Sequence, residues 1–258
     1  MIPEFAKKAV KILETDANVV AIAAGGSWIS GQIDQYSDLD LIIITREKIS
    51  TSKTTMTGYA QKLGILLSSF TGEHVGEPRL LICLYDQPLL HVDLKFITLD
   101  EFKDRIEDPV LLLDKQGAAA EIIRQTTPKP VRPDFQWMED RFWTWIHYAL
   151  LKTGRGEYLE TVDFLAFLRM YVLGPLLQMK NHTQIRGVRK VELELPTDDM
   201  LALKQTIPAY HKTSILNALR NAVSLYRNLR NTLYGDTILL HRAAENAVMH
   251  FFEEIAGE

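Results

Sequence analysis

The 258-residue sequence predicts an α+β protein in two parts. Residues 1–127 are expected to form a mixed β-sheet flanked by helices, because short apolar or alternating runs are interrupted by glycine- and proline-containing turns. Residues 128–258 are expected to form a helical bundle, since the patterns there are helical. Between the two parts, residues 126–133 carry three prolines. Such a segment cannot propagate a helix and indicates an interdomain linker.

The elements of the first half follow from the spacing of apolar residues and from turn residues. We expect an amphipathic helix over 3–14, strands over 18–24 and 38–44, a helix over 52–67, a loop over 71–78, an antiparallel hairpin over 79–85 and 89–97, an edge strand over 110–113 and a short helix over 118–124.

The second half is expected to contain four helices, over 134–152, 157–180, 211–234 and 239–255. In the first of these, Trp137 and Trp145 lie eight residues apart, so a helix places them on roughly one face. The aromatic residues there are expected to pack in a core between helices, with stacking on an adenine or an acceptor ring as the alternative. Residues 227–230 are expected to form a charged helix face.

Composition limits the classes of partner. The net charge of −4 gives no general attraction to nucleic acid, which favours basic surfaces.

The single cysteine, Cys83, lies in an apolar run and is expected to be a buried small side chain without a disulfide. No run approaches the roughly 20 apolar residues of a membrane helix, and the N-terminus lacks a signal-peptide core. We therefore expect a cytoplasmic protein without membrane contact, and the apolar helices would allow a homodimer.

Two aspartates lie at the start of the second predicted strand, over residues 38–44. Because side chains alternate along a strand, Asp38 and Asp40 are expected to point to one face while Leu39 and Leu41 point into the core. Carboxylates at this spacing repel each other and need a cation between them. With oxygen ligands only, the sequence favours Mg²⁺.

A glycine-rich turn lies just before these acids. Gly25 and Gly26 would let the backbone approach phosphate groups without a clash with a Cβ atom. Ser27 offers a hydroxyl, and N–H groups if a helix begins there. The spacing of Gly26 and Gly31 matches half of a P-loop, but the lysine and Ser/Thr that a P-loop needs are missing at the next two positions.

A third acid fits the same site. In residues 89–97, apolar and polar residues alternate strictly, with Asp93 on the polar face beside His91 and Lys95. If this strand lies beside 38–44, Asp93 can reach the same metal centre, where three carboxylates could hold two ions and a nucleoside triphosphate. The alternative is that Asp93 belongs to the polar outer face of an edge strand.

Together these motifs resemble the polymerase-beta-like nucleotidyltransferase superfamily: Gly-Gly-Ser, then Asp-Leu-Asp in a hydrophobic strand, then a further aspartate between hydrophobic residues. Within it, the run from Tyr36 to Asp40 is similar to that of the aminoglycoside and lincosamide adenylyltransferases. The resemblance covers residues 18–97, with softer likeness at 141–143 and 155–157. It implies transfer of a nucleoside monophosphate, AMP from ATP or another triphosphate, to a hydroxyl of a small molecule with release of pyrophosphate.

Transfer also needs cations on the triphosphate and a base. Arg155 is the first candidate cation, with Lys152 and Lys180 behind it; the alternative for each is a solvated or structural charge. Either Asp93 or Glu157 could take the proton of the acceptor hydroxyl, and Glu157 could instead be only the acidic start of a helix.

The sequence therefore predicts a nucleotidyltransferase that requires two Mg²⁺ ions. The metal ligands would be Asp38, Asp40 and Asp93. Two alternatives are transfer to a protein or RNA hydroxyl and a non-catalytic module that binds nucleotides.

Overall fold

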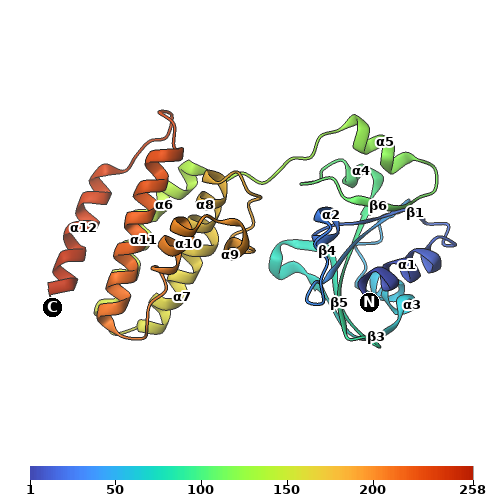
Figure 1. The fold of residues 1–258 in the computed structure, drawn as a ribbon, viewed down its shortest axis with the longest axis horizontal. Coiled ribbons are helices and arrows are strands. Elements are labelled where there is room, and N and C mark those ends of the chain that lie inside the picture. The colour runs from blue at the N-terminus through green and yellow to red at the C-terminus, as the bar shows by residue number, and fades with distance from the viewer. Residues whose placement is uncertain (258) are drawn as a thin grey trace. The chain divides into compact units, whose positions relative to one another are not determined.

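The computed structural model describes residues 1–257. They form two compact units, Met1–Pro130 and Val131–Glu258, and the boundary falls within the proline-rich segment. Figure 1 shows the sheet of the first unit and the helices of the second. A mixed sheet in one unit and a helical second unit confirm the predicted α+β class.

The first unit is built around a six-stranded sheet. Its strands are β1 (Val19–Ala24), β2 (Leu39–Thr45), β3 (Ile65–Gly72), β4 (Glu77–Asp86), β5 (Leu90–Thr98) and β6 (Val110–Asp114). Its helices are α1 (Ile2–Leu13), α2 (Ser27–Ser30), α3 (Lys53–Leu63), α4 (Leu99–Phe102) and α5 (Ala118–Gln125), with a 3₁₀ turn, η1 (Glu73–Val75). The strand order is β3-β4-β5-β2-β1-β6, so the predicted edge strand β6 lies at an edge. The pair of β2 and β5 is parallel, whereas the predicted β4–β5 hairpin is antiparallel.

Helices cover the two faces of the sheet to different extents. The amphipathic α1 and α3 pack on one face, where Leu13 and Leu63 are fully buried against strand residues such as Leu41 (Figure 1). On the opposite face, α4 packs on the C-terminal parts of β2 and β5, where Phe102 and Ile44 belong to one buried cluster, and α5 packs on α4 and β6. The candidate acids Asp40 and Asp93 lie in the N-terminal halves of these two strands.

The helix predicted over 52–67 is too long. Helix α3 ends at Leu63, Gly64 is fully extended, and β3 begins at Ile65. Hydrogen bonding to β4 converts the apolar residues after Gly64 into a strand, because strand formation depends on available partners more than on local preference. The loop predicted over 71–78 is also shorter than expected. Strand β3 ends at Gly72 and β4 begins at Glu77, so only η1 and Gly76 lie between them.

The second unit is helical. Its elements are α6 (Phe135–Gly154), α7 (Tyr158–Leu168), a π-helical turn, η2 (Arg169–Leu173), α8 (Gly174–Lys180), α9 (Val191–Glu194), α10 (Thr197–Lys204), α11 (Lys212–Leu233) and α12 (Arg242–Gly257). The helix predicted over 157–180 is thus interrupted by the π-helical turn, and α9 and α10 were not predicted. The unit has one large apolar core, centred on Phe142, Trp143 and Phe252.

One helical segment departs from the expectation that no run is long enough for a membrane. By length and composition alone, Tyr158–Lys180 could cross one, with a mean hydropathy of 1.3 over its most apolar stretch. That stretch is 50% buried within the protein. Its buried side chains, among them Leu165 and Leu173, belong to the core of the helical unit. A buried core helix passes the same test, so the segment is weak evidence for a membrane.

Candidate functional site

Two of the three candidate metal-binding acids are neighbours in the sheet. Asp40 of β2 and Asp93 of β5 stand opposite each other in the register of the parallel pair. Neighbouring strands lie about 4.8 Å apart, and opposed residues of a parallel pair project to the same face. Both side chains are half-buried. The sheet therefore brings together two carboxylates that lie far apart in the sequence.

Asp38 lies just outside the strand. Strand β2 begins at Leu39, one residue later than expected, and the Asp38 side chain is half-buried. Leu39 and Leu41 are each 1% exposed and face the core, as expected. This alternation directs Asp40 to the opposite face, which is also the face of Asp93.

The glycine turn lies directly against Asp40. The backbone N–H of Gly25 donates a hydrogen bond of 3.0 Å to the carbonyl oxygen of Asp40. Gly26 has φ +58° and ψ −131°, a conformation that is essentially confined to glycine. A Cβ atom on Gly26 would lie 2.1 Å from Oδ2 of Asp40. Glycine is therefore required here by both backbone conformation and space.

Ser27 begins the short helix α2, which follows Gly26 at once. The helix ends after one turn at Gly31, which has φ +67°. Its first residues thus follow the same turn that contacts Asp40. The structure brings Gly25, Gly26 and Ser27 to the acidic end of β2.

A histidine contacts Asp93 directly. Nε2 of His91 lies 3.0 Å from Oδ1 of Asp93, and the His91 side chain is 52% exposed. His91 and Asp93 occupy alternate positions of β5 and so share one face. The strict alternation of residues 89–97 placed His91 on this face, although it gave no reason to assign the residue a role.

Cations also lie beside the acids, in the first unit itself. Lys95 follows Asp93 by two positions on β5, and its Nζ lies 2.7 Å from Oε2 of Glu77. Nε of Arg79 lies 2.7 Å from Oε1 of the same glutamate. Partial burial raises the pKa of Glu77, but hydrogen bonds from Arg79 and Lys95 outweigh this and bring it down to about 2. Lys95 was not predicted as a candidate cation, although the alternation of β5 places it on the face of Asp93.

The carboxylates suit a hard divalent cation. Among residues 1–257, no group of three or more His, Cys, Asp or Glu side chains is arranged to hold a metal ion. Asp40 and Asp93 stand opposite each other in the sheet, and Asp38 lies two residues before Asp40. Two adjacent carboxylates that repel each other, beside a turn that has room for no side chain, fit Mg²⁺ chemistry.

The remaining candidate residues lie in the second unit, and each of them forms an ion pair there. Oε2 of Glu157 lies 2.7 Å from Nζ of Lys152, and Oε1 lies 3.8 Å from Nη1 of Arg155. Glu157 is the N-cap residue of α7. Lys180 is paired with Asp199 at 2.6 Å. The structure therefore groups Arg155 and Glu157 with Lys152.

The tryptophans of α6 lie together, as their spacing predicts. The rings of Trp137 and Trp145 meet edge to face, with 5.3 Å between their centroids. Trp145 also packs edge-on against Phe167 of α7 at 5.2 Å. These contacts support the interpretation that the aromatic residues form helix packing.

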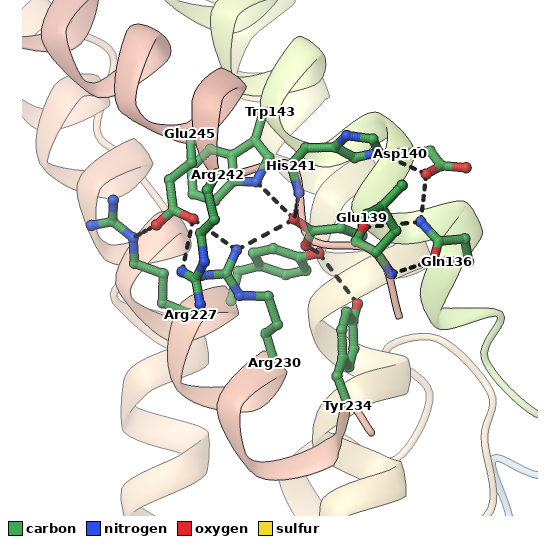
Figure 2. Close-up of polar contacts among 12 residues, drawn as sticks. Gln136, Glu139, Asp140, Trp143, Arg227, Arg230, Tyr234, His241, Arg242 and Glu245 are labelled. Carbon is green, nitrogen blue, oxygen red and sulfur yellow. Dashed lines mark hydrogen bonds and ion pairs between the residues drawn. The ribbon is translucent and has the colours of Figure 1, made fainter. Parts of the chain in front are cut away.

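The charged face predicted over 227–230 is wrong for Arg230. Its side chain is 2% exposed and lies between two buried acids (Figure 2). Nη1 is 2.9 Å from Oε2 of Glu245 on α12 and 3.4 Å from Oε1 of Glu139 on α6. The acids come from two other helices, 91 residues before Arg230 and 15 residues after it, so the periodicity of α11 alone could not reveal them.

Neutral donors complete this buried group. Glu139 accepts hydrogen bonds from Tyr226 Oη at 2.6 Å and from Trp143 Nε1 at 3.2 Å. It also accepts one of 3.0 Å from the backbone N–H of His241, just before α12 (Figure 2). The network ties α6, α11 and α12 together and has the character of a structural element.

Comparisons with known proteins give only distant likenesses. No protein-family model and no curated protein matches the chain. Among solved structures, the chain is similar to an aminoglycoside 6-adenyltransferase from Bacillus subtilis, with 15% identity, a TM-score of 0.42 and coverage of 100% of this chain and 99% of that one.

Two further solved structures are similar over almost the whole chain. A nucleotidyltransferase-like protein from Exiguobacterium sibiricum 255-15 has 10% identity and a TM-score of 0.36, with 99% of this chain and 89% of that one covered. A spectinomycin adenyltransferase from Enterococcus faecialis, solved with ATP and spectinomycin, has 14% identity and a TM-score of 0.34, with 99% and 100% covered. Likenesses at these levels carry no argument about activity, so the case for a function depends on the site itself.

Proposed function

We propose that the chain is a metal-dependent nucleotidyltransferase. It would move a nucleoside monophosphate, AMP from ATP, onto a hydroxyl of a small molecule and release pyrophosphate. The observation that supports this best is the opposition of Asp40 and Asp93 in neighbouring strands, with Gly26 against Asp40. Paired acids beside a side-chain-free turn suit the joint binding of metal and triphosphate.

Each part of the site has an expected role. Asp38, Asp40 and Asp93 would hold Mg²⁺. Gly25, Gly26 and Ser27 would contact the triphosphate through backbone N–H groups and the serine hydroxyl. Mg²⁺, when bound, would neutralise charge on the phosphates and favour loss of the acceptor proton.

An acceptor oxygen forms a bond to the α-phosphorus, and the bond from that phosphorus to the bridging oxygen breaks, so pyrophosphate leaves with the electron pair. A carboxylate takes the hydroxyl proton. Asp93 is the favoured base because it stands opposite Asp40 in the first unit, among the residues proposed to hold the metal and the triphosphate.

The proposal is tested by measuring pyrophosphate release across four nucleoside triphosphates and a panel of aminoglycosides, lincosamides and other polyols. We expect release that requires both Mg²⁺ and an acceptor. Asp40→Asn should lower it about 100-fold or more, since a charge that acts in the transition state is lost.

The matched control is Asp100→Asn, an acid of α4 whose side chain is 87% exposed and paired only with Lys103 among the ion pairs described. It should keep normal activity. Full turnover by Asp40→Asn would contradict the proposal, and nucleotide binding without pyrophosphate release would indicate a non-catalytic module.

A further inference from the structure

An apolar surface continues the row of acids across the sheet. Asp40 stands opposite Asp93, Asp93 opposite Ile82 of β4, and Ile82 opposite Phe70 of β3. Opposed residues in neighbouring strands share a face. One row of side chains therefore runs from two acids to two apolar residues.

The neighbouring rows widen this surface. Leu84 stands opposite His91, and Leu80 stands opposite Lys95. Because alternate residues of a strand share a face, Leu80, Ile82 and Leu84 form one strip along β4. We name Phe70, Leu80, Ile82 and Leu84 the apolar platform. Its strip on β4 spans about 14 Å, which is enough for a molecule of two or three rings.

The platform is open in the protein. Phe70 is 48% exposed and Leu84 is 37% exposed, whereas Leu80 and Ile82 are half-buried. On the opposite face of the same strand, Cys83 and its alternate neighbours are at most 1% exposed. In the described part of the chain, no platform residue belongs to a buried apolar cluster.

The rim of the platform is polar on the side of the acids. Asp93 stands opposite Ile82, His91 opposite Leu84, and Lys95 opposite Leu80. An exposed apolar surface rimmed by polar residues marks an interaction site, and small-molecule sites combine apolar side chains with a few polar groups that fix the orientation of the ligand. A molecule lying here would place its apolar face on β4 and its polar edge at Asp93.

We propose that the apolar platform is the acceptor subsite of the transferase, which rests on the function proposed above. The acceptor is an amphipathic molecule that bears a hydroxyl on one edge and a ring system or alkyl group on its face. The hydroxyl lies at the Asp93 end, next to the acids. A uniformly polar polyol would leave Phe70 and Leu84 in water and bind more weakly.

The test compares two glucosides that differ only in their apolar part. The full chain, labelled with ¹³C at the methyl groups of isoleucine and leucine, is titrated with n-octyl β-D-glucoside below its micelle concentration and with methyl β-D-glucoside. We expect the methyl signals of Ile82 and Leu84 to shift with the octyl compound at concentrations where the methyl compound has no effect.

Two variants and one control define the binding site. Phe70→Ala and Leu84→Ser should each weaken binding of the octyl glucoside about fivefold, as expected for loss of a partly buried apolar contact. Ile106→Ser is the control, because Ile106 is 54% exposed and lies in the loop after α4, away from the platform. It should bind like the unaltered chain.

Equal responses of Ile82 and Leu84 to the two glucosides would overturn the inference. So would an effect of Ile106→Ser as large as that of Phe70→Ala. These readouts need no nucleotidyl transfer. Platform binding without pyrophosphate release would therefore count against the proposed function alone, and release without platform binding would count against the subsite alone.

Discussion

The carboxylate of Asp40 occupies the space that a side chain at Gly26 would need. A Cβ atom there would lie 2.1 Å from Oδ2 and 3.2 Å from Cγ of Asp40. The glycine turn and the acid are thus one structural unit, although 13 positions separate them in the sequence (40 − 26 − 1). Any residue larger than glycine must displace the carboxylate.

Gly26→Ala should therefore abolish transfer. We expect a loss of about 100-fold or more, because displacement of a group that acts in the transition state has a large effect. The measurement is pyrophosphate release at saturating nucleotide. Gly31→Ala is the control, since Gly31 also has positive φ but no atom within 4 Å of its would-be Cβ. If both variants lost activity equally, backbone strain rather than the contact with Asp40 would be the cause.

The buried ion network should contribute to the stability of the helical unit. Arg230→Met removes the cation next to the buried Glu139, while Glu245 keeps Nε of Arg227 at 2.7 Å. The substitution should lower the free energy of unfolding by about 3 kcal/mol. Urea denaturation followed by far-UV circular dichroism measures this. Arg220→Met on the same helix is the control. The Arg220 side chain is 43% exposed, and its Nη2 lies 3.4 Å from Oε1 of Glu253. Arg220→Met should lower the free energy of unfolding by at most about 1 kcal/mol. Equal losses in the two variants would show that burial of the ion pair does not increase its contribution to stability.

Glu77 should make the first unit sensitive to acid. Its pKa is lowered from 4.5 to about 2 in the folded chain, so its stabilising effect is complete well above pH 4.5 and is lost as the pH falls toward 2. Glu77→Gln should cost about 2 kcal/mol at pH 7, after allowance for solvent screening. Urea midpoints at several pH values measure the difference between the two chains. A difference that stayed constant down to pH 2 would contradict this assignment.

Cys83 should be unreactive in the folded protein. Burial raises the pKa of its thiol to about 12, so the thiolate that reacts with iodoacetamide is scarce at pH 8. Alkylation measured by mass spectrometry should be at least about 100-fold slower in buffer than in urea. The chain has no other cysteine, so the signal is unambiguous. Similar rates in the two conditions would show that the strand opens readily.

Alternation and turn residues were sufficient to predict the acidic face of the sheet. The period-2 pattern of residues 89–97 assigned Asp93 to the polar face, and the structure places that face beside Asp40. That β2 and β5 are neighbours could not be predicted, because the pattern within a strand does not show which strand pairs with it.

The elements that were predicted wrongly depend on distant partners. The helix over 52–67 was too long because Ile65 and the residues after it pair with β4, which local periodicity does not show. Arg230 was assigned to a charged surface because its partners, Glu139 and Glu245, come from two other helices. Where a charge or an apolar residue meets a remote partner, only the tertiary fold decides its burial.

We propose that Asp40 and Asp93 hold a divalent cation jointly. Titration with Mn²⁺, followed by electron paramagnetic resonance in the presence of ATP, tests it directly. We predict that Asp40→Asn and Asp93→Asn each weaken Mn²⁺ binding by more than about tenfold, the loss expected even for an outer-shell partner, while Asp100→Asn binds normally. Unchanged Mn²⁺ affinity in Asp93→Asn would contradict the account.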